Sequence, residues 1–210
     1  MNKVKVMAVV IVLLLILLIG GLIAFFTDFD DQTNIFTLGD EVDISLDEVW
    51  TAADGLGIHP GAVVTKAPSI INESTTTPAY VFAEVIVPCY ASTGSTVNTP
   101  LFKLLDSSDN EGCNSGWYLV NTSQIDTTNK TITYVYAYGT SASMTQLAAS
   151  PTTPKTQTST PVFSKVKLDE DLTAEQKATA SSTPNIVINA YGIQTDGVGT
   201  TPAQVWANVK

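Results

Sequence analysis

Ala-Tyr-Val-Phe-Ala-Glu-Val-Ile-Val, residues 79–87, is the stretch that says most about the fold. β-Branched and aromatic residues dominate it, and such residues favour strands. In a strand, the odd-numbered residues would lie on one face and the even-numbered residues, Glu84 among them, on the other. Because both faces are largely apolar, the segment predicts a central strand of a β-sandwich. Pro88 cannot donate to a ladder and is expected to end the strand.

Other short segments of the same kind surround this run. Val42, Ile44 and Leu46 alternate with acidic and polar residues, which predicts a half-buried strand. Residues 131–138 would place Ile132 and three tyrosines on one face. Further candidate strands are residues 101–105, 117–120, 162–168, 186–193 and 205–209.

Helical signals are scarce in the same region. Residues 141–149 and 172–180 are expected to form short helical turns, the second because Thr173 and Gln176 have the spacing of a capping box. Residues 150–161 are rich in Thr and Pro and predict a surface loop. Many short strands between turn-forming residues predict an all-β fold, a jelly-roll-like β-sandwich.

The N-terminal residues have the pattern of a secretion leader. Lysines precede an unbroken apolar run over residues 6–19, and Ala24 is a small residue suited to a cleavage site before Phe25. The apolar stretch is also long enough to cross a bilayer. An N-terminal signal or transmembrane helix is therefore expected over residues 1–24, either cleaved or retained.

This leader divides the chain into three expected parts. Residues 25–40 form an N-terminal segment, and residues 41–210 form the β-sandwich domain. Both fates of the leader place that domain outside the cytoplasm, because the leader lysines stay on the cytoplasmic side. The expected location is extracellular or on the cell surface, and the membrane is a partner only through an uncleaved leader.

Charge narrows the set of partners. The chain has 10 lysines, no arginine and 20 acidic residues, which gives a net charge of −10. Lys3 and Lys5 lie in the leader and no acid does, so its removal changes the net charge to 8 − 20 = −12. A strongly acidic surface repels phosphate backbones, which argues against nucleic acid as a partner.

Cys89 and Cys113 are the two cysteines of the chain. In an exported protein a single pair favours one disulfide. Two free thiols are the alternative, because sequence does not reveal whether the two side chains have the geometry of a bridge.

Motifs for catalysis and cofactors are missing from the sequence. His59 is the one histidine, so the zinc-protease pattern with two histidines is absent, and no nucleophile elbow or Gly-rich phosphate loop follows a strand. Acidic clusters at residues 28–31, 106–111 and 169–171 do not follow the calcium-loop pattern. We therefore expect no enzyme activity, no cofactor and no resident metal, with at most weak surface binding of calcium.

Several short motifs follow one another along nearly the whole chain. They are Ile23-Ala-Phe-Phe-Thr-Asp28, Thr33-Asn-Ile-Phe-Thr-Leu-Gly39, His59-Pro-Gly-Ala-Val-Val-Thr-Lys-Ala-Pro68, Ile71-Asn72, Ala79-Tyr-Val-Phe82, Phe163-Ser-Lys-Val166 and Ile188-Asn-Ala-Tyr-Gly-Ile-Gln194. Their order resembles the TasA/camelysin group of exported proteins of Gram-positive bacteria, whose leaders are cut by a SipW-type signal peptidase. The long apolar leader and the two cysteines depart from that group.

The resemblance implies a jelly-roll domain, a place in the extracellular biofilm matrix and self-association into fibres, with other matrix proteins as further partners. In TasA-like fibres the segment after the cleavage site is similar to a donor strand that completes the sheet of the next subunit. The residues that would form this strand here are Phe25, Phe26, Ile35, Phe36 and Leu38. An extended N-terminal strand of this kind can pair with an open sheet edge.

Two other functions remain open at this stage. Camelysin carries the label of a surface metallo-endopeptidase, so the resemblance also implies an enzyme, although no zinc motif is present. The third interpretation is a membrane-tethered adhesion module with an uncleaved leader.

Overall fold

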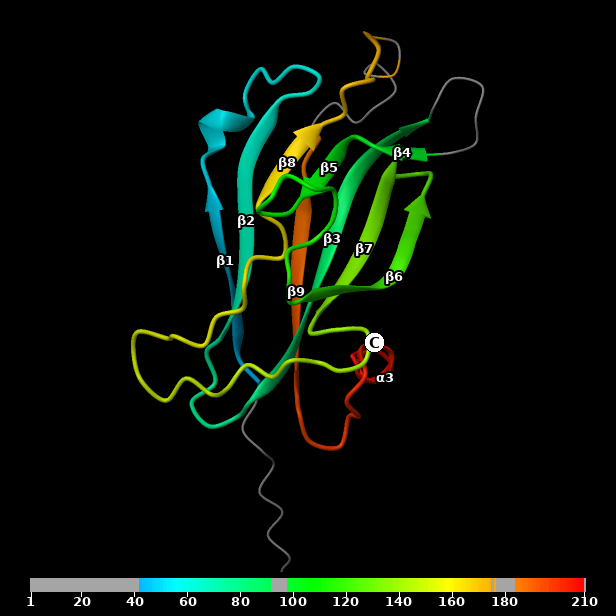
Figure 1. The fold of residues 1–210 in the computed structure, drawn as a ribbon. Coiled ribbons are helices and arrows are strands. Elements are labelled where there is room, and N and C mark those ends of the chain that lie inside the picture. Colours follow the sequence, from blue (N-terminus) through cyan, green and yellow to red (C-terminus); the bar gives the residue numbers. More distant parts are fainter. Residues whose placement is uncertain (1–41, 92–97, 175, 177–183, 210) are drawn as a thin grey trace, which may run out of the picture. The chain divides into compact units, whose positions relative to one another are not determined.

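The computed structural model describes residues 42–91, 98–174, 176 and 184–209, all within the compact unit Gly39–Lys210. Its strands form two antiparallel sheets, which confirms the all-β prediction (Figure 1). The strands are β1 (Ile44–Trp50), β2 (Val63–Asn72), β3 (Ala79–Ala91), β4 (Asn98–Pro100), β5 (Phe102–Leu105), β6 (Trp117–Asp126), β7 (Thr131–Tyr138), β8 (Lys165–Leu168) and β9 (Val187–Gln194). A 3-10 turn η1 (Ala52–Gly55) follows β1, and helix α3 (Pro202–Trp206) follows β9. Within the described ranges, no helix has the length and apolar character needed to span a membrane.

The first sheet has the order β1-β2-β8-β5, and the second has the order β4-β3-β7-β6 with β9 also paired to β3. β3 is central, as its sequence predicts. β7 pairs with it from Phe82 to Pro88, and β9 pairs with its opposite edge from Ala79 to Ile86. β4 continues that second edge at residues 89–91.

The main apolar cluster joins the two sheets. Val81, Ala83, Val85 and Val87 of β3 are fully buried in it, together with residues of β2, β5, β7 and β8. The side chains that the alternation placed on one face of β3 therefore point into the core between the sheets. This burial is the main source of stability for the sandwich.

A second, smaller apolar cluster covers the other face of β3 and β7. Phe82 of β3 and Val205 of α3 are both fully buried in it. The ring of Trp206 lies with its centroid 5.0 Å from that of Phe82 and 5.5 Å from that of Tyr191. Helix α3 thus protects the apolar outer face of the second sheet.

The expected end of the central strand at Pro88 is wrong, because β3 continues to Ala91. The carbonyl of Pro88 accepts from the Leu101 N–H, on the edge of β3 opposite β7. Since the N and C=O of one strand residue point the same way, the missing N–H lies on that edge too, in the gap between β9 and β4. Pro88 therefore costs the β3–β7 ladder no hydrogen bond.

Three further predictions need correction. Residues 205–209 are not a strand: α3 ends at Trp206 and is followed by turn, because Thr201 and Gln204 form a capping box with Pro202 in the first turn. Residues 141–149 form no helix, and the strand predicted over 162–168 begins only at Lys165.

The capping contacts predicted for Thr173 and Gln176, within residues 172–180, are present. The N–H of Thr173 donates to Gln176 Oε1 at 2.8 Å, and the N–H of Gln176 donates to Thr173 Oγ1 at 3.2 Å. Residues 175 and 177–180 of that predicted helix lie outside the described residues.

Candidate functional site

β1 presents a strand edge that is open among the described residues. It pairs with β2 along its whole length, from Ile44 opposite Asn72 to Trp50 opposite Lys66. No other strand of the described residues pairs with β1, so one row of its backbone groups has no ladder partner there. Edge strands are commonly protected from pairing with another chain by charged side chains, inward-pointing charges, prolines or bulges. β1 carries Asp47 and the inward-facing Glu48, which is paired with Lys66, but it has no lysine, proline or bulge, whereas the edge strand β6 has two register shifts.

Large apolar side chains are exposed along β1. The exposed fractions are 39% for Leu46, 64% for Val49 and 40% for Trp50. Leu46 and Trp50 lie opposite the buried residues Ile70 and Lys66, so they belong to the inward face of the first sheet. Their exposure shows that the core is open to solvent along the β1 flank of the sandwich.

β9 borders the same flank on the other side. It touches β1 at Gly192, where an added Cβ would lie 2.9 Å from Ile44 Cγ2 and from Val42 Cγ1. No ladder joins the two strands, and near the other end of β1 the flank contains a cavity of about 380 Å³. The apolar lining of this cavity comes from the first sheet, the connection around η1 and the residues just before β9, and includes Trp50, Leu56, Val64, Phe102, Val166 and Ile186. We call this space the flank cavity.

A buried lysine lies in the wall of the flank cavity. Lys66 is only 8% exposed, and its Nζ lies 2.6 Å from Glu48 Oε1 and 5.0 Å from the centroid of the Trp50 ring. The contact with Glu48 has the distance of an ion pair but not the direction of a hydrogen bond, and Glu48 Oε1 accepts none from the described residues. A buried ammonium with three N–H groups and one ionic neighbour retains donors for a further acceptor.

Gly55 makes room for the Trp50 ring. A Cβ at Gly55 would lie 2.9 Å from Trp50 Cη2 and 3.0 Å from Cζ2. The absence of a side chain in η1 therefore lets the indole lie over the turn and form one wall of the cavity. Neither Trp50 nor Lys66 is among the residues predicted to be functional. The alternation Val64-Lys66-Pro68-Ile70 could have indicated Lys66 as a functional candidate, because it places a lysine on the buried face of β2.

All of the predicted cleavage-site and donor-strand residues lie outside the described residues. The candidate cleavage site, Ala24 and Phe25, lies outside the described residues. The same holds for the remaining candidate donor-strand residues, which are Phe26, Ile35, Phe36 and Leu38. These predictions stay predictions.

The two cysteines are free thiols in the structure, so the bridge predicted between Cys89 and Cys113 is not formed there. Cys89 is buried in β3, and Cys113 lies in the connection before β6, where its Sγ donates to the carbonyl of Trp117 at 3.3 Å. Burial raises the pKa of both thiols, and the negative charge of Asp126 raises that of Cys89 further. Neither thiol is activated as a nucleophile by this environment.

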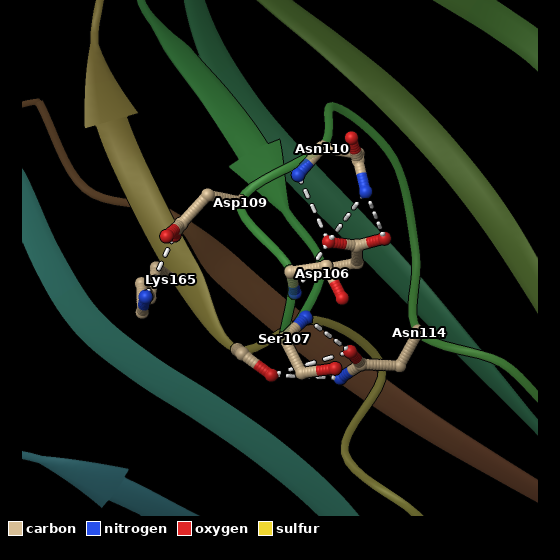
Figure 2. A network of polar contacts seen from close by, with 8 residues as sticks. Asp106, Ser107, Asp109, Asn110, Asn114 and Lys165 are labelled. Carbon is tan, nitrogen blue, oxygen red and sulfur yellow. Dashed lines mark hydrogen bonds and ion pairs between the residues drawn. The ribbon is translucent and has the colours of Figure 1, made fainter.

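The acidic cluster at residues 106–111 mainly organises its own loop (Figure 2). Asp106 Oδ1 accepts from the N–H groups of Ser108 at 2.7 Å and Asn110 at 2.9 Å. The backbone and side chain of Asn110 lower the pKa of Asp106 below its usual value. Asp109 forms an ion pair at 2.6 Å with Lys165, the first residue of the neighbouring strand β8.

His59 and the acidic side chains are the remaining candidates for a metal site. His59 is exposed in the turn before β2. In the part of the chain that the structure describes, no three or more His, Cys, Asp or Glu side chains come together as a metal site would require.

Comparison of the chain with protein-family models, with curated proteins and with solved structures finds no match. The resemblance to the TasA/camelysin group therefore remains a prediction from the sequence motifs.

Proposed function

We propose that this protein is an exported structural protein, a subunit of extracellular matrix or cell-surface fibres, with a jelly-roll-like domain behind a cleaved leader. The observation that carries the proposal is the edge of β1, which has no ladder partner among the described residues and lies beside an open, apolar flank. A long regular edge of this kind favours pairing with a strand from another chain.

The chain offers a strand for that edge. Residues 25–38 lie just before the domain and combine phenylalanines, Ile35 and Leu38 with polar residues. If this segment of one copy pairs with β1 of the next, the contact joins two different surfaces and does not close on itself. Contacts of that kind generate filaments.

Charge supports strand pairing as the driving force. After loss of the leader each copy has a net charge of −12, by the arithmetic above, so copies repel one another at long range. Main-chain hydrogen bonds and apolar burial must then supply the attraction. Raising the ionic strength should speed assembly, because salt screens the repulsion and leaves the strand contact intact.

The test is to isolate the protein from culture supernatant and from the cell surface, determine its N-terminus by mass spectrometry, and image it by negative-stain microscopy. The proposal expects a chain that begins at Phe25 and forms filaments. Intact chains beginning at Met1 and present only as single particles would contradict it and favour a tethered module. Assembly that persists in a variant lacking residues 25–38 would contradict the donor-strand mechanism alone.

A further inference from the structure

We propose that the flank cavity is the anchor pocket for a large apolar side chain of residues 25–38 from a second copy, and that Lys66 donates a hydrogen bond to the main chain of that segment. This inference rests on the proposed function and names the residues that would select the incoming strand.

The position of the cavity favours a peptide as its occupant. The cavity lies at the Trp50 end of β1, beside a strand edge whose N–H and C=O groups have no ladder partner among the described residues. A segment paired with that edge would direct alternate side chains toward the inward face, where Leu46 and Trp50 are exposed. A small ligand would fill the cavity but leave the edge unpaired.

The polar groups of the wall fit a peptide better than a charged small molecule. Lys66 and Glu48 form a pair without net charge, so the wall favours neither an anion nor a cation. Glu48 Oε1 is buried against the Lys66 ammonium, and Lys66 retains N–H donors beyond this one ionic contact. A peptide carbonyl supplies an acceptor for the remaining N–H groups of Lys66.

The walls and size suit a large apolar side chain. Phe102 and Val166 are buried in the first sheet, and Trp50 and Ile186 border the space from two sides. A volume of about 380 Å³ is in the range of natural ligand pockets. Residues 25–38 provide six candidates, which are Phe25, Phe26, Phe29, Ile35, Phe36 and Leu38.

The length of the chain ahead of the domain allows the segment to reach a neighbour. Fourteen residues, 25–38, precede Gly39, and an extended strand rises about 3.3 Å per residue, so the segment spans roughly 46 Å. The edge of β1 from Ile44 to Trp50 needs roughly half of that. The competing arrangement is a hairpin in which the segment turns back at residues 39–41 onto its own β1.

The experiment compares assembly of the secreted, processed protein with that of variants at the cavity. Trp50→Ala removes one wall, and Ile186→Trp fills the space from a partly exposed position outside the central strands. Lys66→Met tests the hydrogen bond while retaining much of the apolar stem. The matched control is Ile125→Ser on β6, which alters a residue with 48% exposure at the edge of the other sheet. Filament growth is followed by light scattering and microscopy, and the folding of each monomer by circular dichroism and Tm.

Anchor residues at the centre of an interface commonly dominate affinity, so the cavity variants should slow filament growth at least about 10-fold while the control grows as wild type. Wild-type growth by all three folded variants would overturn the anchor pocket and leave the proposed function standing. A wild-type protein that forms no filaments would overturn both. A third outcome is that the cavity variants lower the Tm of the monomer and that deletion of residues 25–38 lowers it equally. This result would mean that the chain's own segment fills the pocket, and it would overturn the assignment to a second copy.

A synthetic peptide of residues 25–38 provides an independent measurement on the full-length protein. Added in excess, it should occupy the cavities at growing ends and stop elongation, and a peptide with its four phenylalanines replaced by serine should not. Equal inhibition by both peptides would contradict an apolar anchor. No inhibition by either, with wild-type filaments present, would contradict binding of this segment.

Discussion

Gly192 of β9 lies directly against Ile44 of β1, so close that a Cβ at Gly192 would lie 2.9 Å from Ile44 Cγ2. This contact is the place where the edges of the two sheets meet. Because β1 and β9 share no ladder, side-chain packing at this point holds the flank closed at one end while the flank cavity occupies the other. The position of the β1 edge, which is proposed to accept a strand from another copy, depends on the contact between Gly192 and Ile44.

Gly192→Ala should therefore destabilise the monomer by about 1–2 kcal/mol through overpacking. The measurement is the free energy of unfolding from a denaturant titration. Ile44→Ala removes the crowded Cγ2, so the double variant should lose less stability than the sum of the two single variants. Strict additivity of the two changes would show that this contact is not made.

Asn72 connects β2 to two loops through its buried side chain. Its Nδ2 donates to the carbonyls of Thr77, Leu147 and Ala148 at 3.0, 3.2 and 3.0 Å, and its Oδ1 accepts from the Ser74 N–H. Asn72→Ala would leave these buried groups unpaired and should cost about 3 kcal/mol of unfolding free energy. The exposed Asn129→Ala is the comparison and should cost less than about 1 kcal/mol. Equal losses would refute the role of Asn72.

Alkaline pH should weaken the fold through Tyr90. Its hydroxyl donates to Asp169 Oδ2 at 2.6 Å, and burial, together with this hydrogen bond and the charge of Asp169, raises the pKa of Tyr90 to about 12. The pKa of an unfolded tyrosine is about 10. Because the folded value is the higher one, the contribution is fully present below pH 10 and is lost as the pH rises through 12, by about 2 kcal/mol at pH 12.

The check on this linkage is a comparison of unfolding free energies of the wild type and Tyr90→Phe at pH 8 and pH 12. The wild type should lose about 2 kcal/mol more than the variant over that interval. Other tyrosines with raised pKa, such as Tyr136, contribute to both proteins and cancel in the difference. Parallel pH profiles would contradict the assignment to Tyr90.

Free cysteines have a simple chemical signature. The purified native protein should react slowly with a thiol reagent, because Cys89 is fully buried and the pKa of both thiols is raised. After denaturation without reductant, two thiols per chain should titrate. A mass 2 Da lower than that of the reduced chain, with no thiol released on denaturation, would instead support the disulfide favoured by the sequence pattern.

The parts of the fold that sequence could predict were those governed by local pattern. The alternation in residues 79–87 is enough to place β3 at the centre, because a strand that is apolar on both faces must be covered on both. The C-terminal segment was misread because Val205 and Val209 suggest a strand. The capping pair Thr201 and Gln204, just upstream, instead starts a helix.

The candidate site could not be predicted, since it depends on contacts distant in sequence. β8 pairs with both β2 and β5, and β1 is left at the edge of that sheet. Nothing in the local sequence of β1 shows that its second edge has no ladder partner. The flank cavity likewise needs Trp50 of β1, Phe102 of β5 and Ile186 just before β9, which are distant in sequence and come together only in the folded domain.

Hydrogen exchange of the edge strands is the most direct test of strand addition at β1. The amides of residues 44–50 should exchange faster in the monomer than those of the central strand β3, and should gain strong protection in filaments. Residues 117–126 of β6, the edge of the other sheet, serve as the internal reference and should keep the same exchange in both states. Filaments in which β1 exchanges as in the monomer, or in which protection appears at β6 instead, would contradict the account.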